Sequence, residues 1–158
     1  MILDDFAEFA AALPPMSALI GLDLGDKTIG VAVSDRIGAV ASPLETIRRK
    51  KFTLDAARLL EIIADREVGG ILLGLPRNMD GSEGPRCQST RAFARNLSRL
   101  TELPIGFWDE RLSTVAAERA LLEADTSRKR RAELIDNVAA SYILQGALDR
   151  MRHMRAEG

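Results

Sequence analysis

Apolar residues gather into five short runs that predict β-strands. The first three runs are separated only by the turns at 25–27 and 35–38, and connections this short join antiparallel neighbours. The fourth run, VGGILLGL, contains no polar residue, which predicts a strand buried on both faces. The expected strands span residues 18–24, 28–34, 39–47, 68–75 and 104–108.

Helices are predicted between and after the later strands. Thr53 can cap a helix whose apolar residues recur at helical spacing from Leu54 to Ile63. The order of elements is βββ-α-β-α-β-α-α, and a strand–helix–strand connection makes parallel neighbours through a right-handed crossover. This order predicts an α/β protein with a mixed five-stranded sheet flanked by helices, which is the ribonuclease H-like arrangement. The remaining helices are expected at 87–100, 114–123 and 132–151.

Residues 1–17 are predicted to form an appendage to a single ribonuclease H-like domain at 18–158. An aspartate at position 4 or 5 can cap a short helix that carries Phe6, Phe9 and Leu13 on one face, and two prolines end it. The favoured interpretation is that this helix packs on the surface of its own domain. The alternative is an arm that docks on another subunit.

The composition is that of a globular protein with one compact domain. The 158 residues can bury a sizeable core, and the net charge of −1 excludes a histone-like cationic protein. The single cysteine, Cys87, excludes an intramolecular disulfide and suits a reducing compartment. The acidic N-terminus does not resemble a signal peptide, and no apolar run approaches the roughly 20 residues that span a bilayer. We therefore expect a cytoplasmic protein without a membrane partner.

Acidic residues are expected to meet at one edge of the predicted sheet. Asp23 interrupts the apolar strand in LIGLDLG near its end, and Asp109 and Glu110 follow the last strand. Sites in open α/β sheets gather beyond the carboxyl ends of the strands. Asp136 opens the final helix, and the small Ala140 lies on the same helix face, so this helix can approach the sheet closely.

Converging carboxylates favour a divalent cation. Like charges at short distance raise one another's pKa values, and a bound cation removes that repulsion. Oxygen ligands favour Mg²⁺ or Mn²⁺, as one ion or as two ions about 3.5–4 Å apart. The only histidine, His153, lies near the C-terminus, which argues against serine–histidine or cysteine–histidine catalysis.

Each acid also has a simpler structural explanation. Asp136 can act as a helix cap or dipole partner, and Asp109 or Glu110 can pair with Arg111. Asp23 is harder to explain in this way, because burying a carboxylate in an apolar strand is costly without a partner. Its hairpin has a second interpretation as the phosphate-binding turn of a nucleotide-binding protein.

Four motifs in order are similar to those of one known family. GLDLGDKTIGVAVSD, LLGLPRNMDGSEG, WDERLSTVAAERAL and DNVAASYILQ resemble the YqgF/RuvX family of pre-16S rRNA nucleases, which are related to Holliday junction resolvases. The resemblance covers about residues 19–150. It implies a ribonuclease H-like fold, a bacterial cytoplasmic location and maturation of the 5′ end of 16S rRNA. It also implies a catalytic, metal-binding triad at Asp23, Glu110 and Asp136, and it selects Glu110 over Asp109.

Basic residues near these acids are candidates for binding nucleic acid. Lys27 and Arg111 lie close in sequence to the acids and can either contact phosphate or neutralise an acidic neighbour. Arg77 and Asn78 follow the buried strand at its carboxyl end. A basic loop before the last helix is favoured as a phosphate contact, because like charges in a row repel one another. It comprises Arg128, Lys129, Arg130 and Arg131.

Two further basic groups leave both interpretations open. Arg91, Arg95 and Arg99 form a stripe on one helix, which can bind phosphate or simply face solvent. A compact run at 48–51 is a second candidate.

These observations predict a metal-dependent nuclease acting on the 16S rRNA precursor, free or on the ribosome. The alternatives are a nuclease that resolves branched DNA and a non-catalytic RNA-binding assembly factor. A sugar-kinase- or actin-like ATPase is disfavoured because such proteins duplicate the fold and the chain has one copy. The protein is expected to be a monomer or a homodimer.

Overall fold

The computed structural model describes residues 1–112 and 128–157, with side chains for 1–112 and 137–157. The helix predicted at 114–123 lies outside the described residues. The elements are β1 (Ile2–Leu3), α1 (Phe6–Ala12), β2 (Ala18–Leu24), β3 (Thr28–Ser34), β4 (Ala41–Arg48), α2 (Phe52–Asp65), β5 (Val68–Leu75), α3 (Pro85–Ser98), β6 (Ile105–Asp109), a short 3₁₀ turn (Glu110–Leu112) and α5 (Arg128–Glu157).

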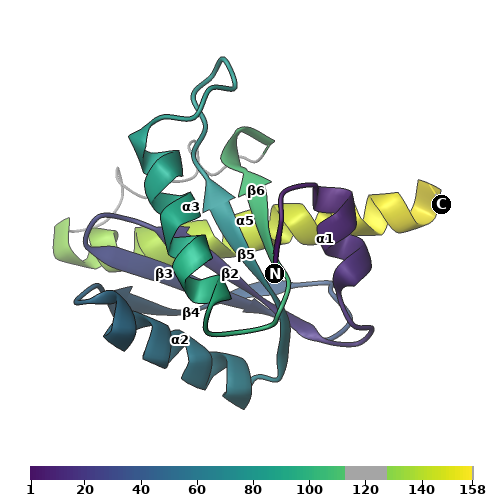
Figure 1. Ribbon diagram of the computed structural model, residues 1–158, viewed down its shortest axis with the longest axis horizontal. Helices are drawn as coiled ribbons and strands as arrows, with labels where there is room; N and C mark the ends of the chain where they lie inside the picture. Colours follow the sequence, from purple (N-terminus) through teal and green to yellow (C-terminus); the bar gives the residue numbers. More distant parts are fainter. Residues whose placement is uncertain (113–127, 158) are drawn as a thin grey trace.

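The strands form one mixed sheet in the order β1-β6-β5-β2-β3-β4. β2, β3 and β4 are antiparallel neighbours, whereas β2 pairs with β5 and β5 with β6 in parallel. Figure 1 shows α2 and α3 on one face of the sheet and α5 crossing the other. The five predicted strands and their mixed arrangement are confirmed.

A sixth strand at the edge of the sheet was not expected. Ile2 and Leu3 pair in parallel with Ile105 and Gly106 of β6. The following helix, α1, is capped by the side chain of Asp5 and buries Phe9 completely. Residues of the N-terminal segment therefore take part in both the sheet and the core.

The sheet separates two hydrophobic cores. The first contains residues of α2 and α3 with the strand residues that face them, such as Leu22 and Leu73. The second contains Leu19, Leu72 and Trp108 with one face of α5 and the apolar side of α1. Because successive strand residues point to opposite faces, Gly21, Asp23 and Gly74 lie on the α5 side.

Three predicted boundaries are wrong. The last helix begins at Arg128 and not at Ala132, so the basic run at 128–131 lies in its first turn and not in a loop. Arginine and lysine are good helix formers, which makes this start compatible with the sequence. Lys51, and not Thr53, caps α2, and α3 begins at Pro85, the first-turn position that proline favours.

Across the described parts of the chain, no helix combines the length and the apolar character that a bilayer crossing requires.

Candidate active site

Asp23 is buried at the carboxyl end of β2, on the face covered by α5. Asp23 is only 6% exposed, although the rest of its strand is apolar. Asp23 pairs across the sheet with Gly30 of β3. On its other side, the pair Leu22–Leu73 places Gly74 of β5 next to it. The carboxylate therefore has a glycine on both neighbouring strands, so neither strand places a side chain of its own beside it.

Glu110 brings a second carboxylate to the same place. It follows β6 directly, in the 3₁₀ turn. A Cβ atom added to Gly74 would lie 3.2 Å from Oε2 of Glu110, so this carboxylate lies over the glycine that neighbours Asp23. The structure thus brings together Asp23 and Glu110, which are far apart in the sequence, at the ends of adjacent parallel strands.

The backbone of α5 approaches the sheet beside these acids. A Cβ atom on Gly21 would lie 2.9 Å from Cβ of Leu144 and 3.3 Å from the carbonyl oxygen of Ala140, so only glycine permits this contact. Further along the helix, Leu148 lines the same cavity as Leu19. The helix therefore runs antiparallel to β2, and its turn before Ala140 lies toward the Asp23 end.

The third predicted acid, Asp136, lies in that turn of α5. It precedes Ala140 by four residues, and the helix backbone includes it. Its side chain is outside the described residues, as are those of Arg128, Lys129, Arg130 and Arg131. Among the side chains that the structure does describe, no three histidine, cysteine or acidic groups cluster as a metal site, so the third ligand remains a prediction.

The donors that are present fit a hard divalent cation. Asp23 and Glu110 supply only carboxylate oxygens, the ligands that Mg²⁺ and Mn²⁺ prefer. The missing side chain of Gly74 is what allows the carboxylate of Glu110 to lie this close to the sheet beside Asp23.

Asp109 has a different role from its neighbour Glu110. The guanidinium of Arg111 donates to both carboxylate oxygens of Asp109, with Nη2 to Oδ2 at 2.7 Å and Nε to Oδ1 at 3.1 Å. The hydrogen bonds from Arg111 hold the pKa of Asp109 below its usual range. Nη1 of Arg111 also donates to the carbonyl of Met79 at 3.3 Å. Arg111 therefore neutralises an acid and fixes a loop, and the geometry agrees with Glu110 as the acid of the site.

Replacing Arg111 by alanine is expected to raise the pKa of Asp109. Because the folded-state pKa of Asp109 is lowered, the pair stabilises the fold above the ordinary aspartate pKa, and this contribution is lost as the pH falls through the folded value. The variant should therefore be slightly less stable than the parent at pH 7, and the difference should shrink toward pH 2, where only the hydrogen bond of Arg111 to Met79 still separates the two proteins. Carboxyl chemical shifts of Asp109 and urea unfolding at both pH values measure this. Equal stability at pH 7, with an unmoved pKa, would contradict it.

The loop after β5 is held by its own polar contacts. The side-chain amide nitrogen of Asn78 donates to the hydroxyl of Ser82 at 3.0 Å, and that hydroxyl donates to the carboxylate of Asp80 at 2.6 Å. Arg77 forms an ion pair with Glu83 at 3.5 Å. Arg77 and Asn78 thus stand at the carboxyl end of β5 as predicted, but both also have a role in holding this loop.

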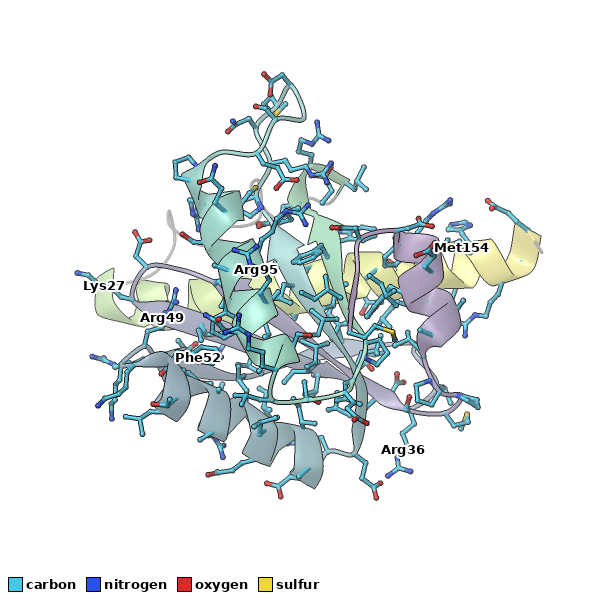
Figure 2. All side chains as sticks on the ribbon, in the orientation of Figure 1. Lys27, Arg36, Arg49, Phe52, Arg95 and Met154 are labelled. Carbon is cyan, nitrogen blue, oxygen red and sulfur yellow. The ribbon has the colours of Figure 1, made fainter. Side chains whose placement is uncertain are left out.

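The predicted basic stripe on α3 is interrupted by ion pairs. Arg91 donates to Glu83 at 2.6 Å and to Asp4 at 2.6 Å, and its guanidinium lies 4.8 Å from the ring centre of Phe107. Arg91 therefore joins α3 to the N-terminal segment and does not face a free surface. Lys27, by contrast, is exposed at the tip of the β2–β3 hairpin (Figure 2).

The sequence reasoning missed the glycines that shape the site. Gly21 and Gly74 each lie inside an apolar strand, where glycine weakens the strand and often marks a close approach of another element. That signal was present in the sequence, although it does not indicate which element approaches.

Comparisons with known proteins identify similar sequences over most of the chain. The family model described as RuvX, Holliday junction resolvase, matches residues 17–150. A curated relative from Ruegeria sp. (strain TM1040) is 86% identical over 99% of both chains. Another, from Ruegeria pomeroyi, is 79% identical over 98% of this chain and 100% of its own. Both are named "Putative pre-16S rRNA nuclease".

Solved structures of Thermus thermophilus RuvC have the same fold. One matches with a TM-score of 0.54 and 16% identity over 85% of this chain and 96% of that chain. A second, of RuvC in complex with a Holliday junction substrate, matches with a TM-score of 0.52 and 13% identity over the same shares. At such low identities the likeness shows the fold alone, which is ribonuclease H-like.

Proposed function

This chain belongs to the RuvX family, and from that membership and the acidic site we propose that it is a metal-dependent nuclease that trims the 5′ end of the 16S rRNA precursor in the cytoplasm. The observation that carries the proposal is the meeting of Asp23 and Glu110 over Gly74 at the ends of parallel strands.

The proposed roles follow from the positions of the acids. Asp23 and Glu110, joined by Asp136 from α5, would hold one or two Mg²⁺ or Mn²⁺ ions. The bound metal would supply an activated water for attack on a phosphodiester and would stabilise the leaving oxygen. Burial of Asp23 and its position in a hydrogen-bonded strand fix the carboxylate before substrate arrives, which lowers the cost of reorganisation during the reaction.

Cationic side chains around the acids are proposed to hold the RNA backbone. Lys27 is exposed at the hairpin tip, three residues beyond the end of β2. Arg111 and Arg77 lie beside the site, although each is already paired with a carboxylate. We therefore assign Lys27 to phosphate contact and assign Arg111 and Arg77 first to the orientation of the loops.

RNA is favoured over branched DNA as the substrate by the relatives. The two Ruegeria proteins are very similar to this chain over nearly their whole length, and their name specifies rRNA. The RuvC complex with a junction shares only the fold, and a fold does not determine a substrate.

The purified protein is expected to cut a 5′-extended 16S precursor when Mg²⁺ or Mn²⁺ is present and to stop cutting in EDTA. The same reactions with a four-way DNA junction of equal concentration test the resolvase alternative. Product ends mapped by primer extension show whether the cut lies at the 5′ side of the mature sequence. Cutting that continues in EDTA would reject the metal mechanism, and cutting of the junction alone would reject rRNA as the substrate.

A further inference from the structure

A polar pocket lies beyond the carboxyl end of β2, on the side of the sheet that carries α2 and α3. Its volume is about 420 Å³, and three separate segments form its walls. They are the β2–β3 turn, the link between β4 and α2, and the first turns of α3. The lining residues that matter here are Gly25, Asp26, Arg49, Lys50, Arg86 and Ser89.

We propose that this pocket binds a backbone phosphate of the substrate strand, next to the phosphate that is cut. The inference rests on the proposed nuclease function and adds a binding subsite to it. Gly25 follows Asp23 by two residues, so the pocket and the acidic site share the end of one strand. A nucleic-acid strand that crosses this end can place one phosphate at the acids and another in the pocket.

The charge of the pocket favours an anion. Arg49, Lys50 and Arg86 supply three positive charges, and Asp26 supplies one negative charge. Within the described part of the chain, none of the three cations forms an ion pair, whereas Arg91 and Arg111 on neighbouring surfaces are paired with carboxylates. The pocket therefore keeps a net positive charge that a phosphate can neutralise.

Arg49 is held in place before any ligand binds. Its Nη1 donates to the carbonyl of Gly25 at 2.6 Å, and its backbone amide donates to the carbonyl of Lys27 at 2.8 Å. Its guanidinium also lies 5.8 Å from the ring centre of Phe93 on α3. One side chain thus ties together the three segments that form the pocket, so a ligand would bind without ordering these segments first.

The position of Arg86 gives an independent reason to expect an anion. Arg86 lies in the first turn of α3, and that turn contains no acidic residue. A cation near a helix N-terminus is repelled by the helix dipole, whereas an anion there is stabilised. A phosphate placed between Arg86 and the helix end would be attracted both by the guanidinium and by the positive end of the helix dipole. The cap residue Gly84 has no side chain to occupy the same position.

The neighbouring hydroxyls fit the same ligand. Thr90 is buried and donates to the carbonyl of Arg86 at 3.0 Å, which holds the first turn of α3 in shape. Ser89 is exposed in the wall of the pocket and can donate to a phosphate oxygen.

The test measures RNA binding in EDTA, so that no cutting occurs. A fluorescent single-stranded RNA is titrated with the full chain by anisotropy at several KCl concentrations. Each phosphate contact contributes about 0.7 to the slope of log affinity against log salt for a single strand. The double variant Lys50→Ala/Arg86→Ala should reduce the slope by about 0.7, and Lys50→Arg/Arg86→Lys should restore it. Asp26→Asn should bind RNA more tightly than the parent.

Arg66→Ala is the matched control. Arg66 is exposed at the other end of α2, away from the pocket. Like the pocket cations, it forms no ion pair within the described part of the chain. This variant should keep the parent slope. Three results would each contradict the proposed phosphate site. They are an unchanged salt slope in the double variant, an equal loss of slope in Arg66→Ala, and no measurable RNA binding by the parent. These results do not depend on cleavage, so failure of the parent to cut any substrate would reject the proposed nuclease separately.

Discussion

Replacing Asp23 by asparagine is expected to lower the rate of precursor cleavage by about a thousand-fold, the loss typical of removing one preorganised electrostatic group from an active site. Asparagine has the same shape as aspartate but carries no negative charge, so it is a poor ligand for a hard cation. Cleavage of the 5′-extended precursor under single-turnover conditions measures the effect, because substrate binding and product release then do not limit the rate.

The matched control for this variant is Glu61→Gln. Glu61 is an exposed residue of α2 that pairs with Arg58, far from the acidic edge of the sheet, so removal of its charge should leave the cleavage rate unchanged. Thermal unfolding of both variants shows whether the fold is intact. Cutting by folded Asp23→Asn at the parent rate would remove Asp23 from the mechanism.

Replacing Gly74 by alanine is expected to damage both stability and activity. The new Cβ would lie 2.5 Å from Cδ1 of Ile143 and 3.2 Å from Oε2 of Glu110. Ile143 is fully buried and has little room to move, and overpacking of this kind costs about 1–3 kcal/mol of the free energy of unfolding. The same methyl group displaces the carboxylate of Glu110, so cleavage should fall by more than the loss of folded protein explains.

Gly106→Ala separates these two effects. A Cβ atom at Gly106 would lie 2.5 Å from the ring of Phe9, which is a comparable clash on the same face of the sheet. No acidic group is among the atoms that this Cβ would meet. Urea unfolding should show similar destabilisation of the two variants, while the cleavage rate per folded molecule should fall only in Gly74→Ala. Equal rates per folded molecule would show that Glu110 tolerates a side chain beneath it.

Most of the central sheet could be predicted because its sequence signals are local. The runs that became β2, β3 and β5 are mainly apolar and end at clear turn residues. The strand β1 could not be found in this way, because two residues show no periodicity. Ile2 and Leu3 form a strand only because the open edge of β6, which lies about a hundred positions later, supplies hydrogen-bond partners.

The acidic residues of the candidate site could be predicted from the sequence, whereas the roles of the basic residues around it could not. Asp23 stood out because a carboxylate in an apolar strand is unusual. The meaning of an arginine depends on neighbours that are distant in sequence: Arg91 is paired with Asp4, and Arg49 is tied to the β2–β3 turn. Counting basic residues along the chain therefore left the α3 stripe and the run at 48–51 undecided, and it did not single out Arg86.

The contact between β6 and α5 also provides an optical reporter. Trp108 is the only tryptophan in the chain, and it directly precedes the acidic turn at Asp109 and Glu110. Its ring lies 5.3 Å from that of Phe6 and contacts the backbone of α5 at Gly146. Its emission spectrum should therefore report on this junction alone, without any label. Stopped-flow fluorescence can follow the arrival of a metal ion or an RNA strand at the neighbouring acids in real time.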